Sequence, residues 1–481
     1  MLRSLGEVII VHHIACENKP KMKKYTLLLT VLVLFAVSSM ANAQNNLHSL
    51  GEGDQPSLSS SVNGVIGITY GNDEDIFYVF SNDNGKTFSS PEKVATLKDL
   101  VIGMSSGPRL SMGKEYYSII APNRAGDLTA YRKKPDSKKW EGPFKVNDVP
   151  GSAGEMLADI SSDDKGMLYA TWIDTRKERE SHQTEGHDMK PGGHEVKERA
   201  AREGHEKEVK EGLATGMNHS AAQPLSKEAL DKEIGEMPEG AKGVSQYPGL
   251  DGKMYWVVKG ENGEVLKAKD LENYKAFKAA NAGRQKTQGK IYITTSTDGG
   301  KSWLKSKMVY ASPDGSVCEC CKPSILASNN NVYIMFRNNI SGNRDLYLTR
   351  SNNGGNSFGS PEKLGMGTWP INGCPMDGGG LDVNTGTIST IWQRQGKVYT
   401  VSPGGKEVLL GSGRSPVIAS TKNGNYALWN DGPKIMSMLP KDNKASEIGE
   451  GNSPRLLKLP NGQGALGVWI SGDKIVAKRL M

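Results

Sequence analysis

The sequence predicts an all-β fold, a seven-bladed β-propeller that is closed by a strand near the N-terminus. Three observations predict it: a motif that starts an apolar strand recurs seven times, one hairpin turn occurs in three copies, and a segment near the start of the chain resembles two segments near its end. Short β runs at regular spacing, separated by Gly and Asn turns, are typical of an all-β repeat closed on itself.

Each repeat begins with a turn that contains a proline or a small residue and leads into an apolar strand. The seven start motifs are residues 55–58, 107–110, 155–158, 322–325, 379–382, 415–418 and 453–456. Aromatic-rich strands follow most of them, at residues 66–70, 116–120, 168–173, 332–337, 388–394, 426–430 and 465–470. Each pair predicts the innermost and second strands of one blade.

Three turns copy one another, and we call them the box turns: residues 81–88, 296–303 and 351–358. Each has Ser, then Asp or Asn, then Gly and an aromatic residue at the same spacing, and each joins two strand-like runs. Asp, Asn and Gly are the residues that a tight hairpin with positive φ requires. We expect the Asp side chains to bond the local backbone and the aromatic rings to pack between sheets.

The seventh repeat lacks an outer strand, because its third strand at residues 474–479 is the last in the sequence. Residues 50–56 resemble residues 410–416 and 448–454, each of which ends one blade and begins the next. Residues 47–50 are therefore predicted to supply the missing strand and to cover the exposed edge of the last blade.

The N-terminal segment predicts export. A Met-Lys-Lys start at residue 22, an apolar run at 27–37 and the small residues Ala41 and Ala43 are typical of a signal peptide. The predicted division is 1–21 as a gene-model extension, 22–43 as the signal peptide, 44–176 and 291–481 as the propeller, and 177–290 as an insertion. Cleavage near Ala43 predicts a periplasmic or extracellular protein, and no later segment is long and apolar enough to span a bilayer.

Charge gives no reason to expect nucleic acid as a partner. The full chain has a net charge of +7, which falls to +4 without residues 1–43, because these carry five Lys or Arg and two Asp or Glu. Such a mild basic balance is not typical of nucleic-acid binding.

The insertion at 177–290 interrupts the third blade after its second strand. Charged and helix-forming residues replace the β pattern, and they predict helices between 206 and 236 and a small hairpin between 255 and 266. Histidines concentrate there, His182, His187 and His194 among them, together with methionines. Two interpretations stay open: a solvated, partly disordered loop, or loose capture of copper or zinc by imidazole and thioether groups.

Four cysteines remain after the predicted cleavage: Cys318, Cys320, Cys321 and Cys374. In an oxidising compartment an even number normally forms disulfides, here two, with three pairings open. The alternative is a thiolate metal site, in which four sulfurs suit zinc and a set that includes Met376 favours copper.

Propeller geometry predicts that these groups meet on one rim. The loop that enters an innermost strand and the loop that leaves a second strand open on the same face, and the cysteine segments and the insertion belong to such loops in blades three to five. Guanidinium groups gathered there would bind an anionic ligand, because they pair with carboxylates. The arginines predicted on this face are Arg109, Arg337, Arg394, Arg414 and Arg455.

The box turns resemble the Asp-box, or BNR repeat, of the sialidase (neuraminidase) superfamily, a family of β-propellers. The resemblance implies a glycoside hydrolase that binds the carboxylate of sialic acid with an arginine triad and requires no cofactor. It also implies an Asp as acid/base and a Tyr nucleophile activated by a Glu. Loop position selects Asp73 or Asp174 for the acid/base, Tyr70 for the nucleophile and Glu74 as its partner.

This sequence departs from the family pattern in two respects. Sialidases have six blades, so six is the alternative count. The first arginine of the family lies in an Arg-Ile-Pro motif, and here the Pro-Arg-Leu segments 108–110 and 454–456 come near it.

Two functions are predicted. The first is an exported sialidase-like propeller that hydrolyses or binds an acidic glycan, or a small anionic ligand, through the arginine-lined face. The alternative is a periplasmic copper or zinc protein that uses the cysteine loops and the His/Met-rich insertion. A scaffold for a protein partner is the third option, since fold does not determine function.

Overall fold

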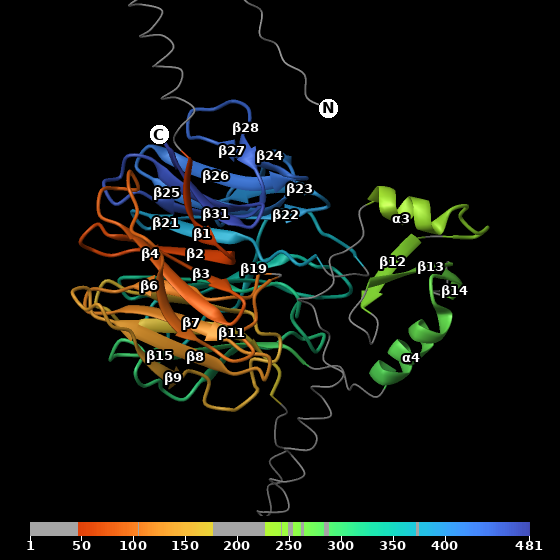
Figure 1. Ribbon diagram of the computed structural model, residues 1–481, viewed down its shortest axis with the longest axis horizontal. Coiled ribbons are helices and arrows are strands. Elements are labelled where there is room, and N and C mark those ends of the chain that lie inside the picture. The colour runs from red at the N-terminus through yellow and green to blue at the C-terminus, as the bar shows by residue number, and fades with distance from the viewer. Residues whose placement is uncertain are drawn as a thin grey trace, which may run out of the picture. The chain divides into compact units, whose positions relative to one another are not determined.

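The computed structural model describes residues 47–103, 105–176, 227–241, 243–248, 254–260, 264–282, 288–371 and 375–481. Among these residues the strands form seven four-stranded sheets, arranged as a β-propeller, and one three-stranded sheet (Figure 1). The predicted all-β, seven-bladed fold is therefore confirmed, and the six-bladed alternative is wrong.

Each blade runs from an innermost to an outermost strand. Blade one is β2 (Asp54–Ser60), β3 (Ile66–Asn72), β4 (Asp75–Ser81) and β5 (Glu92–Thr96). Blade two is β6 (Arg109–Met112), β7 (Tyr117–Pro122), β8 (Leu128–Lys133) and β9 (Glu141–Lys145). Blade three is β10 (Ala158–Ser162), β11 (Leu168–Asp174), β15 (Lys290–Ser296) and β16 (Lys307–Tyr310). Blade four is β17 (Ser324–Ser328), β18 (Asn331–Arg337), β19 (Leu346–Ser351) and β20 (Glu362–Lys363).

The remaining three blades follow the same order. Blade five is β21 (Gly380–Asn384), β22 (Thr387–Arg394), β23 (Lys397–Val401) and β24 (Val408–Ser412). Blade six is β25 (Arg414–Thr421), β26 (Gly424–Asp431), β27 (Lys434–Met438) and β28 (Ser446–Glu450). Blade seven is β29 (Asn452–Lys458), β30 (Ala465–Ser471) and β31 (Lys474–Leu480), with β1 (Leu47–Glu52) as its outermost strand.

The ring is closed by contacts between innermost strands. Each of them contacts the innermost strands of both neighbours, in the order β2, β6, β10, β17, β21, β25, β29 and back to β2. The fourth strand of blade seven is β1, hydrogen-bonded to β31. The predicted closure by an N-terminal strand is thus confirmed, and it pairs an edge that would otherwise be open.

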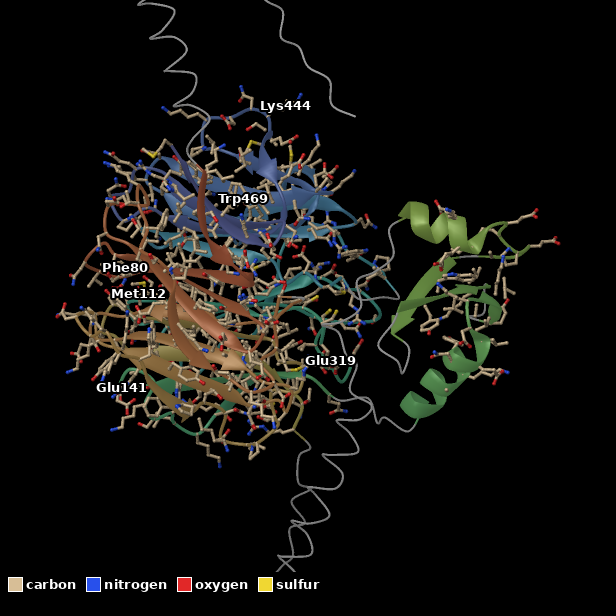
Figure 2. The ribbon with its side chains drawn as sticks, viewed as in Figure 1. Phe80, Met112, Glu141, Glu319, Lys444 and Trp469 are labelled. Atoms are coloured by element: carbon tan, nitrogen blue, oxygen red, sulfur yellow. The ribbon has the colours of Figure 1, made fainter. Side chains whose placement is uncertain are left out.

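Apolar residues fill the space between neighbouring blades. Buried clusters at each of the seven blade-to-blade interfaces combine residues from both blades. Aliphatic residues make up most of this core, and its largest fully buried side chains are aromatic, each burying much apolar area; the fully buried tryptophans are Trp172, Trp392, Trp429 and Trp469. Figure 2 shows Trp469 inside the stacked sheets and Lys444 at their periphery.

The three box turns are held by the same hydrogen bonds. In the first, Ser81 donates to Asp83 at 2.8 Å, and Asp83 accepts from the backbone amide and the hydroxyl of Thr87 at 2.9 and 2.6 Å. Asp298 does the same in the second turn. In the third, Asn353 accepts from the Ser357 amide and donates its own amide to the Ser357 hydroxyl.

The aromatic residues of the box turns face the interblade core. Phe88, Trp303 and Phe358 each pack against the cluster that their blade shares with the preceding blade. These contacts agree with the structural role expected from the sequence.

The described part of the insertion, between β11 and β15, has its own small sheet. Its elements are α3 (Lys227–Ile234), β12 (Gly243–Pro248), β13 (Met254–Lys259), β14 (Val265–Ala268) and α4 (Leu271–Ala282). The antiparallel pair β13 and β14 lies where the hairpin was predicted, and α3 lies within the predicted helical segment, whereas β12 and α4 were not predicted. No helix in these described ranges is long and apolar enough to cross a membrane.

Candidate functional site

A cavity of about 470 Å³ lies between the innermost strands of all seven blades, and we call it the central channel. Charged side chains line it, and five of them lie near the beginning of innermost strands. The two arginines there come from blades two and seven, the lysine from blade four, and the acids from blades three and five: Arg109, Arg455, Lys322, Asp159 and Asp377. The closed ring thus brings together residues that are more than 340 positions apart in the chain.

Arg109, the first residue of β6, is buried with only 3% of its surface exposed. One of its guanidinium nitrogens donates to the Ser105 carbonyl, but Nε and Nη1 have no hydrogen-bond partner among the described residues. Burial lowers the pKa of Arg109, and the nearby carboxylates of Asp159 and Asp54 oppose this effect. Arg109 is therefore a buried cation with two unused donors, an arrangement that is costly without a partner.

Arg455, on β29, places a second guanidinium beside the first. It donates to the side chain of Gln55 at 3.2 Å and to the Pro454 carbonyl at 2.9 Å. Burial, followed by repulsion from Arg109, lowers the pKa of Arg455 to about 9, so the group stays charged at neutral pH. Neither arginine forms an ion pair within the part of the chain that the structure describes.

Lys322 precedes β17 and forms the one ion pair in this group, to Asp159 at 2.8 Å. Burial lowers the pKa of Lys322 to about 8; Asp159 opposes the shift, and Arg109 and Arg455 add to it. The ion pair neutralises Asp159, so it leaves little negative charge for the two arginines.

The loops before β17 and β21 meet beside the channel. The carboxylate of Asp377 accepts hydrogen bonds from the amides of Gly379 and Ser415, so its oxygens are used by backbone groups. At Gly378 an added Cβ would lie 1.9 Å from the carbonyl oxygen of Lys322, which only glycine avoids. The close approach fixes Lys322 next to the start of blade five.

Three of the five predicted arginines do not line the channel. Arg337 is buried and donates to the carbonyls of Asp377, Arg344 and Gln393 at 2.6 to 3.0 Å. Arg394 forms a two-bond ion pair with Glu407 at 2.9 and 2.5 Å.

Arg414, the third, is exposed and donates to the Pro375 carbonyl at 2.8 Å. Only Arg109 and Arg455 come together.

The residues predicted for catalysis also lie outside the channel lining. Asp73 is an exposed turn residue with φ of 51°, and Glu74 accepts a hydrogen bond from the Asp99 amide at 2.7 Å. Asp174 is buried in a bonded pair with Arg176 and also accepts from the Trp172 indole at 2.8 Å.

Tyr70 has the same position and role as two tryptophans. Its hydroxyl donates to the Leu50 carbonyl on the outer strand of the preceding blade, just as Trp429 and Trp469 donate to Ser412 and Glu450. Burial raises the pKa of Tyr70 to about 12, which keeps the hydroxyl protonated. This geometry favours a structural contact between blades over a nucleophile.

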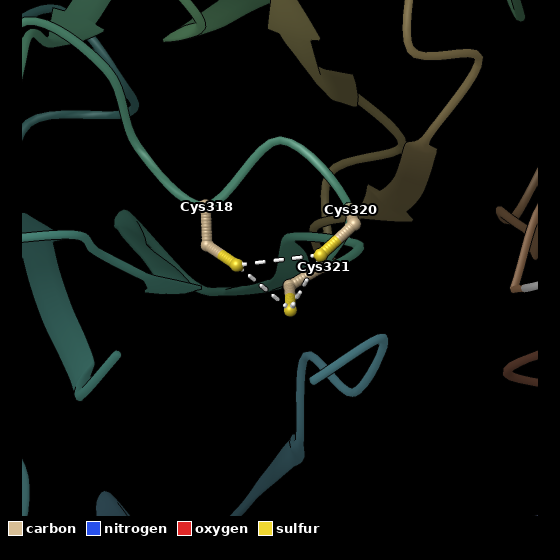
Figure 3. Close-up of side chains that lie close together, drawn as sticks. All are labelled: Cys318, Cys320 and Cys321. Carbon is tan, nitrogen blue, oxygen red and sulfur yellow. Dashed lines mark hydrogen bonds between the residues drawn. The ribbon is translucent and has the colours of Figure 1, made fainter. Parts of the chain in front are cut away.

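The cysteines of the loop before β17 form one cluster (Figure 3). The Sγ atoms of Cys318 and Cys321 are 3.1 Å apart, and that of Cys320 lies 3.6 Å from Cys318 and 3.9 Å from Cys321. Cys318 and Cys321 are free, buried thiols, whereas Cys320 is in a disulfide. The hydrogen bond between Cys318 and Cys321, helped by the charges of Arg344 and Arg337, lowers the pKa of Cys318, while burial raises that of Cys321.

The sulfur atoms can be tested for a fit to a metal ion. The three lie within 4.8 Å of one another, close enough to share an ion. Zinc and copper bind thiolates, and a cysteine in a disulfide has none to offer, so this state leaves Cys318 and Cys321 as two ligands. The copper or zinc site expected from the sequence stays a prediction. Met376, with φ of 54°, is in the neighbouring loop, and Cys374, His182, His187 and His194 lie outside the described residues.

Sequence reasoning missed the three residues that complete the charged end of the channel, Lys322, Asp159 and Asp377. Lys322 is the first residue of a start motif, and Asp159 directly follows another. The signal that could have identified them is a charged residue near the beginning of an innermost strand, and the prediction applied it only to arginine.

Comparisons with known proteins support no family assignment. No protein-family model and no curated protein matches the sequence. Similar solved structures include an oligogalacturonate lyase in complex with manganese, 8% identical over 91% of this chain and 90% of that chain with a TM-score of 0.41.

Two further structures are similar at the same level. The NanB sialidase from Streptococcus pneumoniae is 12% identical over 91% of this chain and 71% of that one, with a TM-score of 0.36. A lectin from Burkholderia pseudomallei is 12% identical over 84% and 100%, with a TM-score of 0.35. Such values are too low to support a function, so we infer the function from the geometry of the channel.

Proposed function

We propose that this protein binds an acidic glycan in its central channel and holds a carboxylate of the sugar with Arg109 and Arg455. The observation that carries the proposal is the buried guanidinium of Arg109, whose Nε and Nη1 have no partner among the described residues. An unsatisfied buried donor costs about 1–3 kcal/mol, and more when it is charged. A bound carboxylate would remove this cost and also reduce the repulsion between the two arginines.

The rest of the channel suits a sugar. The Lys322–Asp159 ion pair adds an ammonium donor and a carboxylate acceptor for sugar hydroxyls. Serine side chains from several innermost strands supply further polar groups; those in the lining are Ser57, Ser59, Ser111, Ser161 and Ser324. A cavity of about 470 Å³ is within the size range of small-molecule sites.

Binding is favoured over hydrolysis as the activity. None of Asp73, Glu74, Asp174 and Tyr70 lines the channel, and each that is buried is held by bonds to the protein. An active glycosidase of the predicted type needs its acid/base and nucleophile beside the bound sugar.

The binding test compares an acidic sugar with its ester. We expect N-acetylneuraminic acid or galacturonic acid to bind in titration calorimetry, and the corresponding methyl esters to bind at least about tenfold more weakly, because the ester lacks the charge that the arginines recognise. Arg394→Met is the matched control, since Arg394 is already paired with Glu407. Equal affinity for acid and ester, or no binding of either, would contradict the proposal.

A separate assay addresses hydrolysis. A fluorogenic sialoside should release no fluorophore between about pH 4 and pH 8, the range in which carboxyl and imidazole groups titrate. Turnover that survives Tyr70→Phe and disappears in Asp159→Asn would move the catalytic centre into the channel.

Export belongs to the same proposal, because glycans of this kind are met outside the cytoplasm. Residues 22–43 lie outside the described residues, so the signal peptide stays a prediction. N-terminal sequencing of the protein purified from its host should begin at Gln44, and retention of residues 22–43 would overturn it.

A further inference from the structure

The central channel places a buried lysine beside the two arginines of the proposed carboxylate site. We infer that Lys322 forms a covalent imine with the carbonyl of an α-keto acid whose carboxylate is held by Arg109 and Arg455. Pyruvate is a small member of this class, and N-acetylneuraminic acid is another in its open-chain form. The inference rests on the proposed function for the carboxylate and adds a covalent step at Lys322.

Three acceptors fix the nitrogen of Lys322 in the channel lining. It donates to the Asp159 carboxylate at 2.8 Å, to the Pro323 carbonyl at 2.9 Å and to the Ser324 hydroxyl at 3.4 Å. Only 15% of the lysine side chain is exposed. An amine that is already held in place attacks a bound carbonyl with less loss of freedom than a mobile surface lysine.

The surroundings of Lys322 favour a nucleophilic amine. Burial lowers the pKa of Lys322 to about 8; Asp159 opposes the shift, and the charges of Arg109 and Arg455 add to it. About a tenth of the groups are then neutral at pH 7, against well under about 1% for an ordinary lysine. A lysine that is desolvated and placed next to other cations is one of the known forms of an activated amine.

The same arginines bring the carbonyl to the lysine. Nε and Nη1 of Arg109 have no partner among the described residues, and a guanidinium binds a carboxylate through two such donors. In an α-keto acid the carbonyl carbon is bonded directly to the carboxylate carbon. A carboxylate on Arg109 and Arg455 therefore carries the carbonyl into the cluster of side chains that contains Lys322 and Asp159.

The reaction balances without an oxidant or a reductant. Asp159 takes a proton from the Lys322 ammonium, and the amine attacks the carbonyl carbon, so that a C–N bond forms and the π electron pair of the carbonyl moves to oxygen. A proton moves from nitrogen to that oxygen and gives a neutral carbinolamine. The nitrogen lone pair then breaks the C–O bond, and Asp159 gives its proton to the leaving hydroxyl. The products are a protonated imine and one water, and Asp159 is again a carboxylate.

A second lysine of the channel offers a matched control. Lys458 also lines the channel and is also paired with an aspartate, Asp382, at 3.2 Å. Its side chain is 42% exposed, against 15% for Lys322. It follows Arg455 by three residues on β29, which puts the two backbones about 10 Å apart. We therefore expect Lys322 to react and Lys458 not to react.

The test traps the imine with sodium cyanoborohydride, which reduces protonated imines and spares ketones. The full chain is incubated with pyruvate and the reductant at about pH 7, where ordinary lysines are protonated. It is then digested and mapped by mass spectrometry. Lys322 should gain the mass of pyruvic acid less one oxygen before any other lysine does. Acetone, which has the carbonyl without the carboxylate, should label Lys322 far more slowly.

Variants separate the amine from the carboxylate site. Lys322→Arg should give no adduct at that position, and Lys458→Met should be labelled as the unaltered protein is. Arg109→Met should need at least about tenfold more pyruvate for the same rate of labelling, because a hydrogen bond to a charged group is lost.

The outcomes distinguish this inference from the proposed function. If the protein binds galacturonic acid more tightly than its methyl ester but pyruvate leaves Lys322 unlabelled, the carboxylate site stands and the imine is wrong. Equal labelling of Lys322 by pyruvate and acetone, or labelling of Lys458 at the same rate as Lys322, also overturns the inference. These results come from the unaltered protein, so a variant that fails to fold does not affect them.

Discussion

Two sets of arginines occupy comparable places in the propeller and differ in what surrounds them. Arg337 and Arg394 each end a second strand, and their guanidinium groups are bonded within the protein. Arg337 donates to three carbonyls, and Arg394 forms an ion pair with Glu407. Arg109 and Arg455, on innermost strands, have no ion pair among the described residues. The difference teaches that an arginine is available to a ligand only when the fold leaves its donors unused.

The largest effect is expected for Arg337→Met, on stability. The substitution leaves the carbonyls of Asp377, Arg344 and Gln393 without their donor, at about 1–3 kcal/mol for each buried group that stays unsatisfied. We expect the free energy of unfolding in urea to fall by about 3 kcal/mol or more. A loss below about 1 kcal/mol would mean that water replaces the guanidinium and that the two sets of arginines do not differ.

Arg109→Met should not reduce stability, in contrast to Arg337→Met. A methionine removes a buried charge with unused donors, so the free energy of unfolding should stay the same or rise. The affinity for an acidic sugar should fall about 10- to 100-fold, since a hydrogen bond to a charged group contributes about 1.5–3 kcal/mol. Titration calorimetry tests the affinity, and urea unfolding of the same sample tests the stability. Reduced stability with unchanged affinity would mean that Arg109, like Arg337, has a structural role.

Lys322 should make the affinity depend on pH. Its pKa is about 8, lowered first by burial and also by Arg109 and Arg455, with Asp159 opposing. A bound anion favours the protonated lysine, so affinity should decrease as the pH rises from 7 to 9, while both arginines keep most of their charge at the lower end of this range. Lys322→Met should bind more weakly and show a flatter dependence. An affinity that rises with pH would contradict this role.

The smallest effects are expected in the box turns, where the Asp carboxylates, like the guanidinium of Arg337, already have hydrogen-bond partners within the protein. Asn353 already replaces Asp in the third turn with the same backbone bond at 3.0 Å, so Asp83→Asn should cost well under about 1 kcal/mol, and Asp83→Ala about 1 kcal/mol. Burial raises the pKa of Asp83, but hydrogen bonds from Thr87 and Ser81 lower it more, to well below its usual value.

The sign of the acid dependence follows from that direction. A carboxyl whose pKa is lowered by folding stabilises the protein above its unfolded pKa, and this contribution is lost as the pH falls through the folded pKa. Acid unfolding of Asp83→Asn should therefore show a weaker loss of stability below about pH 4 than the unaltered protein. An unchanged acid profile would mean that Asp83 is not linked to folding.

The sequence predicted the blades well because their signals are local. Apolar strands, turn residues and the resemblance between residues 50–56 and 448–454 all lie within short windows, and the observed innermost and second strands fall on the predicted segments. β12 and α4 were missed because the charged insertion has no clear periodicity of either kind.

The candidate site was predictable only in part. Arg109 and Arg455 could be named from their position at innermost strands. Two acceptors of Arg337 lie in the next blade, and the pairing of Arg394 with Glu407, 13 residues on, depends on how the outer strands of blade five fold, so neither set of bonds could be predicted from the sequence. Tyr70 stood out as an aromatic residue near an acid, and only the structure shows that its hydroxyl matches the indoles of Trp429 and Trp469.

The most direct test of the central claim is a crystal structure of the protein soaked with an acidic monosaccharide such as galacturonic acid. The account predicts electron density for the sugar in the central channel, with its carboxylate oxygens within about 3 Å of Arg109 and Arg455. Density for the sugar at Arg394 or Arg414, or a channel that holds ordered water alone at saturating sugar, would contradict it.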